Sequence, residues 1–183
     1  MIRRNVLKSA LAASAITATL VLGALPGHAG DAGLTDGAIF AIYNQVNSMD
    51  IETALLGELK GSAEDVRALG HMVSGDHTGV RKAAHELAVA EGIVAELPAS
   101  RMAAAQAHYD VVAGLREASG EAFDAAYLRH EIAFHEAAID AVKTVLIPAT
   151  QNAELKAHFE AVLPHFQHHL DETRRVAKEL GIE

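Results

Sequence analysis

Apolar residues recur at spacings of three and four almost everywhere after Thr35, and no strand-like alternation persists. This period places the apolar side chains on one face of an α-helix. Gly61, Ser119, Gly120 and Pro148 break the pattern, and Ser62 with Asp65 three residues later resembles a capping box at a helix start. The predicted helices span residues 35–60, 62–91, 101–118, 121–146 and about 150–180.

The four long helices each carry an apolar stripe, and these stripes must be buried against one another. The links between the first pair and between the last pair are short, so each pair is predicted to be an antiparallel hairpin. The connection between the pairs is long and contains the short helix over residues 101–118. This pattern predicts an all-α, ferritin-like four-helix bundle with an extra helix in its long connection.

Residues 1–29 are predicted to be a signal peptide. Arg3, Arg4 and Lys8 precede an uncharged apolar run, and small residues lead to a cleavage site after Ala29. The stretch "RRNVLK" also resembles the twin-arginine export motif, so an ordinary secretory signal and a twin-arginine signal are both open. Residues 30–183 are then expected to form a single domain in the periplasm or associated with the cell envelope.

The charge of the mature chain excludes some classes of partner. Without the three basic residues of the signal, 12 basic residues face 24 acidic ones, a net charge of −12. So negative a surface repels nucleic acid, and no membrane span is expected after cleavage. The absence of cysteine excludes disulfides and thiolate metal sites. Nothing in the sequence identifies a protein partner.

Ionisable side chains interrupt the apolar stripes of all four long helices. At about 100° per residue, the following five fall on core-facing lines: Asp50, His77, Glu131, His135 and His169. Counted from the inter-helix turns, they lie within about one or two helical turns of a common level. Asp124 shares the arc of Glu131, and His165 lies beside the line of His169. In contrast, His71, His85 and His168 are predicted to point outward.

A buried mixture of imidazoles and carboxylates suits iron, manganese, zinc or copper. The sequence therefore predicts metal ligands at Asp50, His77, Glu131, His135 and His169, with Asp124 and His165 as outer groups that orient a ligand. The alternative is an internal hydrogen-bonded network that binds nothing, for example Asp50 with His77. A di-iron oxidase is disfavoured, because its Glu-x-x-His spacing does not occur.

Three segments resemble a known bacterial family, domain of unknown function 4142, whose members are often labelled outer membrane proteins. The segments are "DVRALGHMVSGDHTGVRKAAHELA" with an Asp-His pair, "LREASGEAFDAAYLRHEIAFHEAAI", and "VLPHFQHHL". The matching motif residues are Asp76, His77, Ser119, Gly120, Phe123, Asp124, Tyr127, His135, His169 and Leu170. The first helix departs from the family, which usually offers a Glu where Asp50 or Glu52 stands. The resemblance implies an exported, ferritin-like helical bundle without an established activity.

Two functions are consistent with these observations. The first is an exported binding protein that holds a transition metal in a buried layer of histidines and carboxylates. The second is a non-enzymatic structural or stress-related protein of the envelope, whose buried polar network binds nothing. The chain contains neither a glycine-rich phosphate loop after a strand nor a nucleophile elbow, so a non-enzymatic role is favoured and no reaction is assigned.

Overall fold

The computed structural model describes residues 33–182, and the predicted signal peptide lies outside this range. Within it all the regular secondary structure is helical and no strand is present, as the apolar spacing predicts. The elements are α1 (Asp36–Lys60), α2 (Glu64–Ala90), α3 (Arg101–Glu117), α4 (Gly120–Ala141), the π-helical turn η1 (Val142–Leu146), α5 (Ile147–Ala149) and α6 (Ala153–Glu179).

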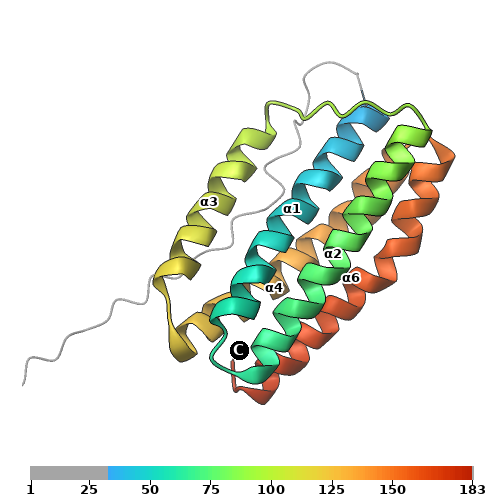
Figure 1. Ribbon diagram of the computed structural model, residues 1–183. Coiled ribbons are helices and arrows are strands. Elements are labelled where there is room, and N and C mark those ends of the chain that lie inside the picture. Colours follow the sequence, from blue (N-terminus) through green and yellow to red (C-terminus); the bar gives the residue numbers. More distant parts are fainter. Residues whose placement is uncertain (1–32, 183) are drawn as a thin grey trace, which may run out of the picture.

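Four long helices form the body of the molecule (Figure 1). Helix α1 packs against α2 and α4, and α6 packs against the same two helices. The helices α1 and α6 run in one direction, whereas α2 and α4 run in the other (Figure 1). Helix α3 lies outside this group, where it contacts α1 and α4. No helix in residues 33–182 is long and apolar enough to cross a membrane.

The start of α2 differs from the predicted capping box. Ala63 is the N-cap residue, and its side chain makes no capping hydrogen bond. The carboxylate of Asp124 in α4 instead accepts hydrogen bonds from the backbone N–H groups of Ser62 (2.8 Å) and Ala63 (2.9 Å) and from the Ser62 hydroxyl (2.5 Å). A negative charge is favourable at this position, because the first N–H groups of a helix lack partners within the helix.

The interior contains two apolar clusters, one toward each end of the bundle. The first includes Ile39, Phe40, Tyr43, Ile139, Leu155 and Phe159. The second includes Ala54, Val66, Leu69, Phe123, Leu128 and Val176.

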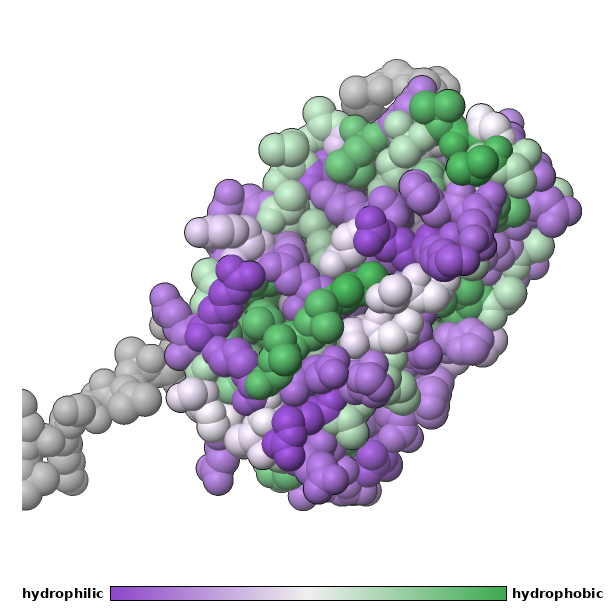
Figure 2. All heavy atoms as spheres, in the orientation of Figure 1, coloured by the Kyte–Doolittle hydropathy of each residue, from purple (hydrophilic) through white to green (hydrophobic). Residues whose placement is uncertain are grey.

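The two clusters are separated at the same level in α1 and α4. In α1 the first cluster ends at Tyr43 and the second begins at Ala54, and in α4 the second ends at Leu128 and the first resumes at Ile139. Polar side chains occupy the level between them. On the face shown in Figure 2, hydrophilic residues cover most of the surface and apolar residues form separate groups. Because hydrophilic residues normally lie on the surface, the polar side chains at this level of the interior need a specific explanation.

Candidate metal centre

The polar layer brings together all five side chains that were predicted to face the core. Asp50 comes from α1, His77 from α2, Glu131 and His135 from α4, and His169 from α6. None of the five is more than 3% exposed to solvent. All five face the core because each occupies a position in the three- or four-residue repeat of its helix. They lie at one height along the bundle because the helices pack antiparallel to one another.

The hydrogen bonds of Asn47 fix the proton of His77. The Asn47 side-chain Nδ2 donates to the carbonyl of Tyr43 (2.8 Å), so its Oδ1 is the atom that faces His77. This oxygen lies 2.8 Å from Nδ1 of His77 and can only accept. Nδ1 of His77 therefore carries the hydrogen, and in the neutral ring Nε2 is left with its lone pair.

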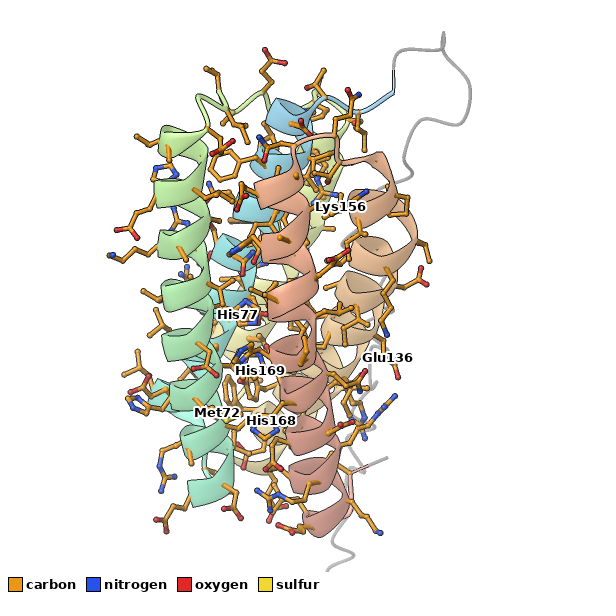
Figure 3. All side chains as sticks on the ribbon, turned by 90° about the vertical axis from the view of Figure 1, so that its right-hand side faces the viewer. Met72, His77, Glu136, Lys156, His168 and His169 are labelled. Atoms are coloured by element: carbon orange, nitrogen blue, oxygen red, sulfur yellow. The ribbon has the colours of Figure 1, made fainter. Side chains whose placement is uncertain are left out.

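His169 has the opposite tautomer. Its Nε2 lies 2.9 Å from Oδ2 of Asp76, and an ionised carboxylate only accepts hydrogen bonds. Nε2 of His169 is therefore the donor, and Nδ1 of the neutral ring holds the lone pair. This Nδ1 lies 3.2 Å from Nε2 of His77. Figure 3 shows the two rings close together between α2 and α6.

His135 follows the same pattern as the other two histidines. Its Nδ1 lies 3.0 Å from the backbone carbonyl oxygen of Glu131, which can only accept, so Nδ1 donates. Its Nε2 is buried and has no hydrogen-bond partner among residues 33–182. That nitrogen lies 3.5 Å from Oδ2 of Asp50. In their neutral forms, the three imidazoles thus direct their N–H groups outward and their lone pairs inward.

The inward groups form one cluster of acceptors. A ring nitrogen of each of His77, His135 and His169 lies within 4.8 Å of the other two. Oδ2 of Asp50 lies 3.0 Å from Nε2 of His77, yet neither oxygen of Asp50 makes a hydrogen bond to any residue in 33–182. Lone pairs that face one another in a dry interior repel, and either a metal ion or a proton on His77 would relieve this repulsion.

Burial and neighbouring charges set the protonation of these groups. Burial lowers the pKa of His135 and lowers the pKa of His169 to about 4, which keeps both rings neutral and able to bind a metal. Burial alone would raise the pKa of Asp50, but His77, His135 and His169 lower it below its usual range. Asp50 is therefore ionised at neutral pH.

Glu131 lies at the edge of the cluster. Both of its carboxyl oxygens are buried without a hydrogen-bond partner among residues 33–182. Its Oε2 is 3.7 Å from Nδ1 of His135, on the side of that ring opposite the inward Nε2. Burial and the negative charge of Asp50 raise the pKa of Glu131 well above its usual value. Asp50, Glu131 and His135 are also close enough together to hold an ion.

The two residues predicted as outer groups do not contact the cluster. Asp124 is buried, but it binds the turn before α2, so the prediction that it orients an imidazole was wrong. His165 is exposed on α6, because a flanking position one helical turn before His169 turns toward solvent. The outward orientation predicted for His71, His85 and His168 is confirmed, since all three are exposed.

Two residues that support the cluster were missed by sequence reasoning. Asn47 lies one turn before Asp50 in the same apolar stripe, and this spacing could have identified it. Asp76 directly precedes His77, and its side chain is 47% exposed. Its place in the Asp-His pair could have pointed to a role at the site. Its hydrogen bond to His169, however, depends on how α2 and α6 pack.

The chain was compared with known proteins. Residues 23–176 match the model of a family described as "Domain of unknown function (DUF4142)". No curated protein and no solved structure matches the chain. The match spans most of the chain and includes all five buried residues of the polar layer, and it confirms the family resemblance found in the sequence. The buried imidazoles and carboxylates described above therefore lie in a protein that belongs to the DUF4142 family.

Proposed function

We propose that this protein binds one divalent transition-metal ion in the polar layer, through His77, His135, His169 and Asp50. The observation that carries the proposal is the orientation of the three imidazoles. Each donates its outer N–H, respectively to Asn47, to the carbonyl of Glu131 and to Asp76. Metal-binding histidines in proteins are oriented by the same kind of outer hydrogen bond.

The charge of the layer favours a divalent ion. Three neutral imidazoles contribute no charge. Asp50 is ionised, and a cation bound beside Glu131 would favour the ionised form of that carboxylate as well, which brings the charge of the layer to −2. One divalent cation neutralises this charge in an interior where net charge is costly. We therefore include Glu131 in the site as the second negative charge. Imidazole and carboxylate ligands suit iron, manganese, zinc and copper, and the donor set does not choose among them.

We further propose that the protein is exported and that its bundle is of the ferritin-like type. The directions of α1, α2, α4 and α6 support this assignment, as does the long α2–α4 connection that contains α3. The sequence of residues 1–29 supports export to the periplasm or envelope. A twin-arginine signal would carry the folded protein with its metal already bound. The mass of the mature protein tests cleavage after Ala29.

The alternative is a polar layer that binds a proton and no metal. The 3.0 Å contact between Nε2 of His77 and Oδ2 of Asp50 favours it, because a doubly protonated His77 would form an ion pair with Asp50. In this case the layer would fix the register of the helices, as in a structural envelope protein. The two candidates differ in whether the folded protein contains stoichiometric metal.

Elemental analysis of protein folded in the cell and purified without chelator distinguishes the two functions. We expect about one metal ion per chain. His77→Ala and His169→Ala should each remove the ion while the helical circular dichroism remains. The matched controls are His71→Ala and His168→Ala, which alter exposed histidines on the same two helices. Wild-type protein without metal, whose melting temperature is unchanged by iron, copper, zinc or manganese, would contradict metal binding.

A further inference from the structure

A small cavity lies against one side of the polar layer. Its volume is about 30 Å³, and one end is formed by Asn47, Asp50, His77 and His135. The remaining walls are largely apolar and include Ile42, Val46, Phe134, Ala138, Val142 and Leu146. The cavity therefore connects the candidate metal centre to an apolar space inside the bundle.

The cavity borders three of the four proposed metal ligands. Asp50, His77 and His135 line it, whereas His169 is not part of its walls and is hydrogen-bonded to Asp76. A molecule inside the cavity would thus lie next to an ion bound by these ligands. The position suits an additional, exchangeable ligand of the ion.

Both carboxylate oxygens of Asp50 and Nε2 of His135 lack a hydrogen-bond partner among residues 33–182, and an ion bound by Asp50, His77 and His135 would engage the inward atoms of these side chains. The other polar side chains of the cavity wall are already paired. The hydroxyl of Tyr43 pairs with Nε2 of His158 at 3.2 Å. The side chain of Asn47 uses its Nδ2 on the carbonyl of Tyr43 and its Oδ1 on His77. A buried water usually needs at least two polar partners, and apolar cavities stay dry and accept apolar guests. An uncharged, weakly polar molecule therefore fits these walls better than water or an anion.

The size of the cavity limits the guest to very few atoms. A cavity of about 30 Å³ has room for only a very few atoms, as in a diatomic molecule. Organic substrates typically occupy pockets of roughly 300–1,000 Å³. The small side chain of Ala138 leaves part of this space, and the π-helical turn η1 contributes Val142 and Leu146 to its far end. Short π-helical segments often occur at functional sites.

We propose that the metal centre binds an uncharged diatomic gas, of the class of dioxygen and nitric oxide, in this cavity. The proposal rests on the proposed metal-binding function, because the ion supplies the bond to the gas. The gas is proposed to bind to the ion, and no reaction of the gas is proposed. The metal content is measured independently of gas binding, which allows the two proposals to be tested separately.

Xenon binding to the zinc-loaded full chain tests the cavity. Xenon is an apolar atom that enters such spaces, and its site can be located in crystals under xenon pressure or by amide shifts in NMR spectra. We expect one xenon site beside Ala138, and Ala138→Leu should abolish it. Ala138→Val is the milder variant if leucine impairs folding, and Ala122→Leu on the exposed side of α4 is the matched control. Absence of xenon from the wild-type cavity would overturn the proposal.

A second experiment tests whether the gas binds to the metal. Nitric oxide is added, in the absence of oxygen, to protein loaded with ferrous iron. We expect the electron paramagnetic resonance signal of a ferrous nitrosyl complex in the wild type and in Ala122→Leu. Ala138→Leu should keep its iron and lose at least tenfold in affinity for nitric oxide. Stoichiometric iron without a nitrosyl signal would overturn the gas proposal alone. Failure to bind any metal would overturn the metal proposal, and the gas proposal with it.

Discussion

His169 and Asp76 connect the dry interior to the surface of the bundle. Nε2 of His169, which is fully buried, lies 2.9 Å from Oδ2 of Asp76, whose side chain is 47% exposed. The bond fixes the tautomer of the ring and aims its lone pair at His77. When a carboxylate accepts a hydrogen bond from the outer N–H of an imidazole, the inner nitrogen of that ring also becomes more basic.

Replacement of Asp76 is therefore expected to weaken metal binding without removing a ligand. Asp76→Ala should lower the affinity by about 10- to 100-fold, the usual effect of losing such a partner. Asp76→Asn should have a smaller effect, because its amide oxygen can still accept the hydrogen bond. Isothermal titration calorimetry with zinc measures both, and Asp65→Asn, on the exposed surface of α2, is the control. Equal affinities for Asp76→Ala and the wild type would refute the role of Asp76.

Glu131→Gln tests the second negative charge of the layer. The raised pKa of Glu131 means that the metal-free protein holds a neutral acid there, whereas the unfolded chain ionises it at neutral pH. Glutamine should therefore raise the melting temperature of the metal-free protein at neutral pH, because the unfolded chain no longer gains from this ionisation. Metal binding should weaken at least tenfold, because one charge that balances the divalent ion is lost. Glu136→Gln is the matched control, since Glu136 lies on the outer side of α4 (Figure 3). A variant that retains full affinity would show that Asp50 alone supplies the charge.

Asp124→Ala distinguishes a structural carboxylate from one that serves the metal. The substitution removes the acceptor for two backbone N–H groups and one hydroxyl at the turn before α2. Hydrogen bonds to charged groups contribute about 1.5–3 kcal/mol each, although some of these donors can be rehydrated. We expect the free energy of unfolding in urea to fall by about 2–3 kcal/mol. The metal content should stay unchanged, and Asp140→Ala, an exposed acid on α4, should affect neither quantity.

The periodicity of the sequence was sufficient to predict the helices and most of the polar layer. Helix α2 was expected over residues 62–91 and spans Glu64–Ala90, because Gly61 and the polar residues around it break the pattern locally. The direction of a side chain on a helix depends on its position alone. Asp50, His77, Glu131, His135 and His169 could therefore be assigned to the interior before the packing was known.

The contacts that join different helices could not be predicted in this way. The turn before α2 is held by Asp124, which lies about sixty residues later in the chain, so the local resemblance of Ser62 and Asp65 to a capping box was misleading. The bond between Asp76 and His169 likewise depends on the distance between two helices. Residues on the flank of a stripe, such as His165, turn inward or outward according to how closely a neighbour packs.

The stability of the metal-free protein should depend on pH in a way that follows from its buried histidines. Burial lowers the pKa of His130 and of His169 to about 4 and also lowers that of His135. An unfolded chain protonates these rings near their ordinary pKa of about 6.5. Between pH 6.5 and about 4 the unfolded state thus binds more protons than the folded state, and the free energy of unfolding falls as the pH falls.

Glu131 acts in the opposite direction, because its pKa is raised. The folded state keeps its proton above pH 4.5, so its stabilising contribution is lost as the pH rises through the folded pKa. Below pH 6.5, the three histidines with lowered pKa values change the free energy of unfolding more than Glu131 does. Above pH 6.5, only Glu131 among these four groups still changes it. We expect the stability of the metal-free protein to be greatest near pH 6.5–7. Urea unfolding from pH 4.5 to 8.5 measures this profile, and Glu131→Gln should remove the decline on the alkaline side and steepen the fall on the acid side. A wild-type stability that does not change between pH 4.5 and 6.5 would mean that these histidines are already charged in the folded protein.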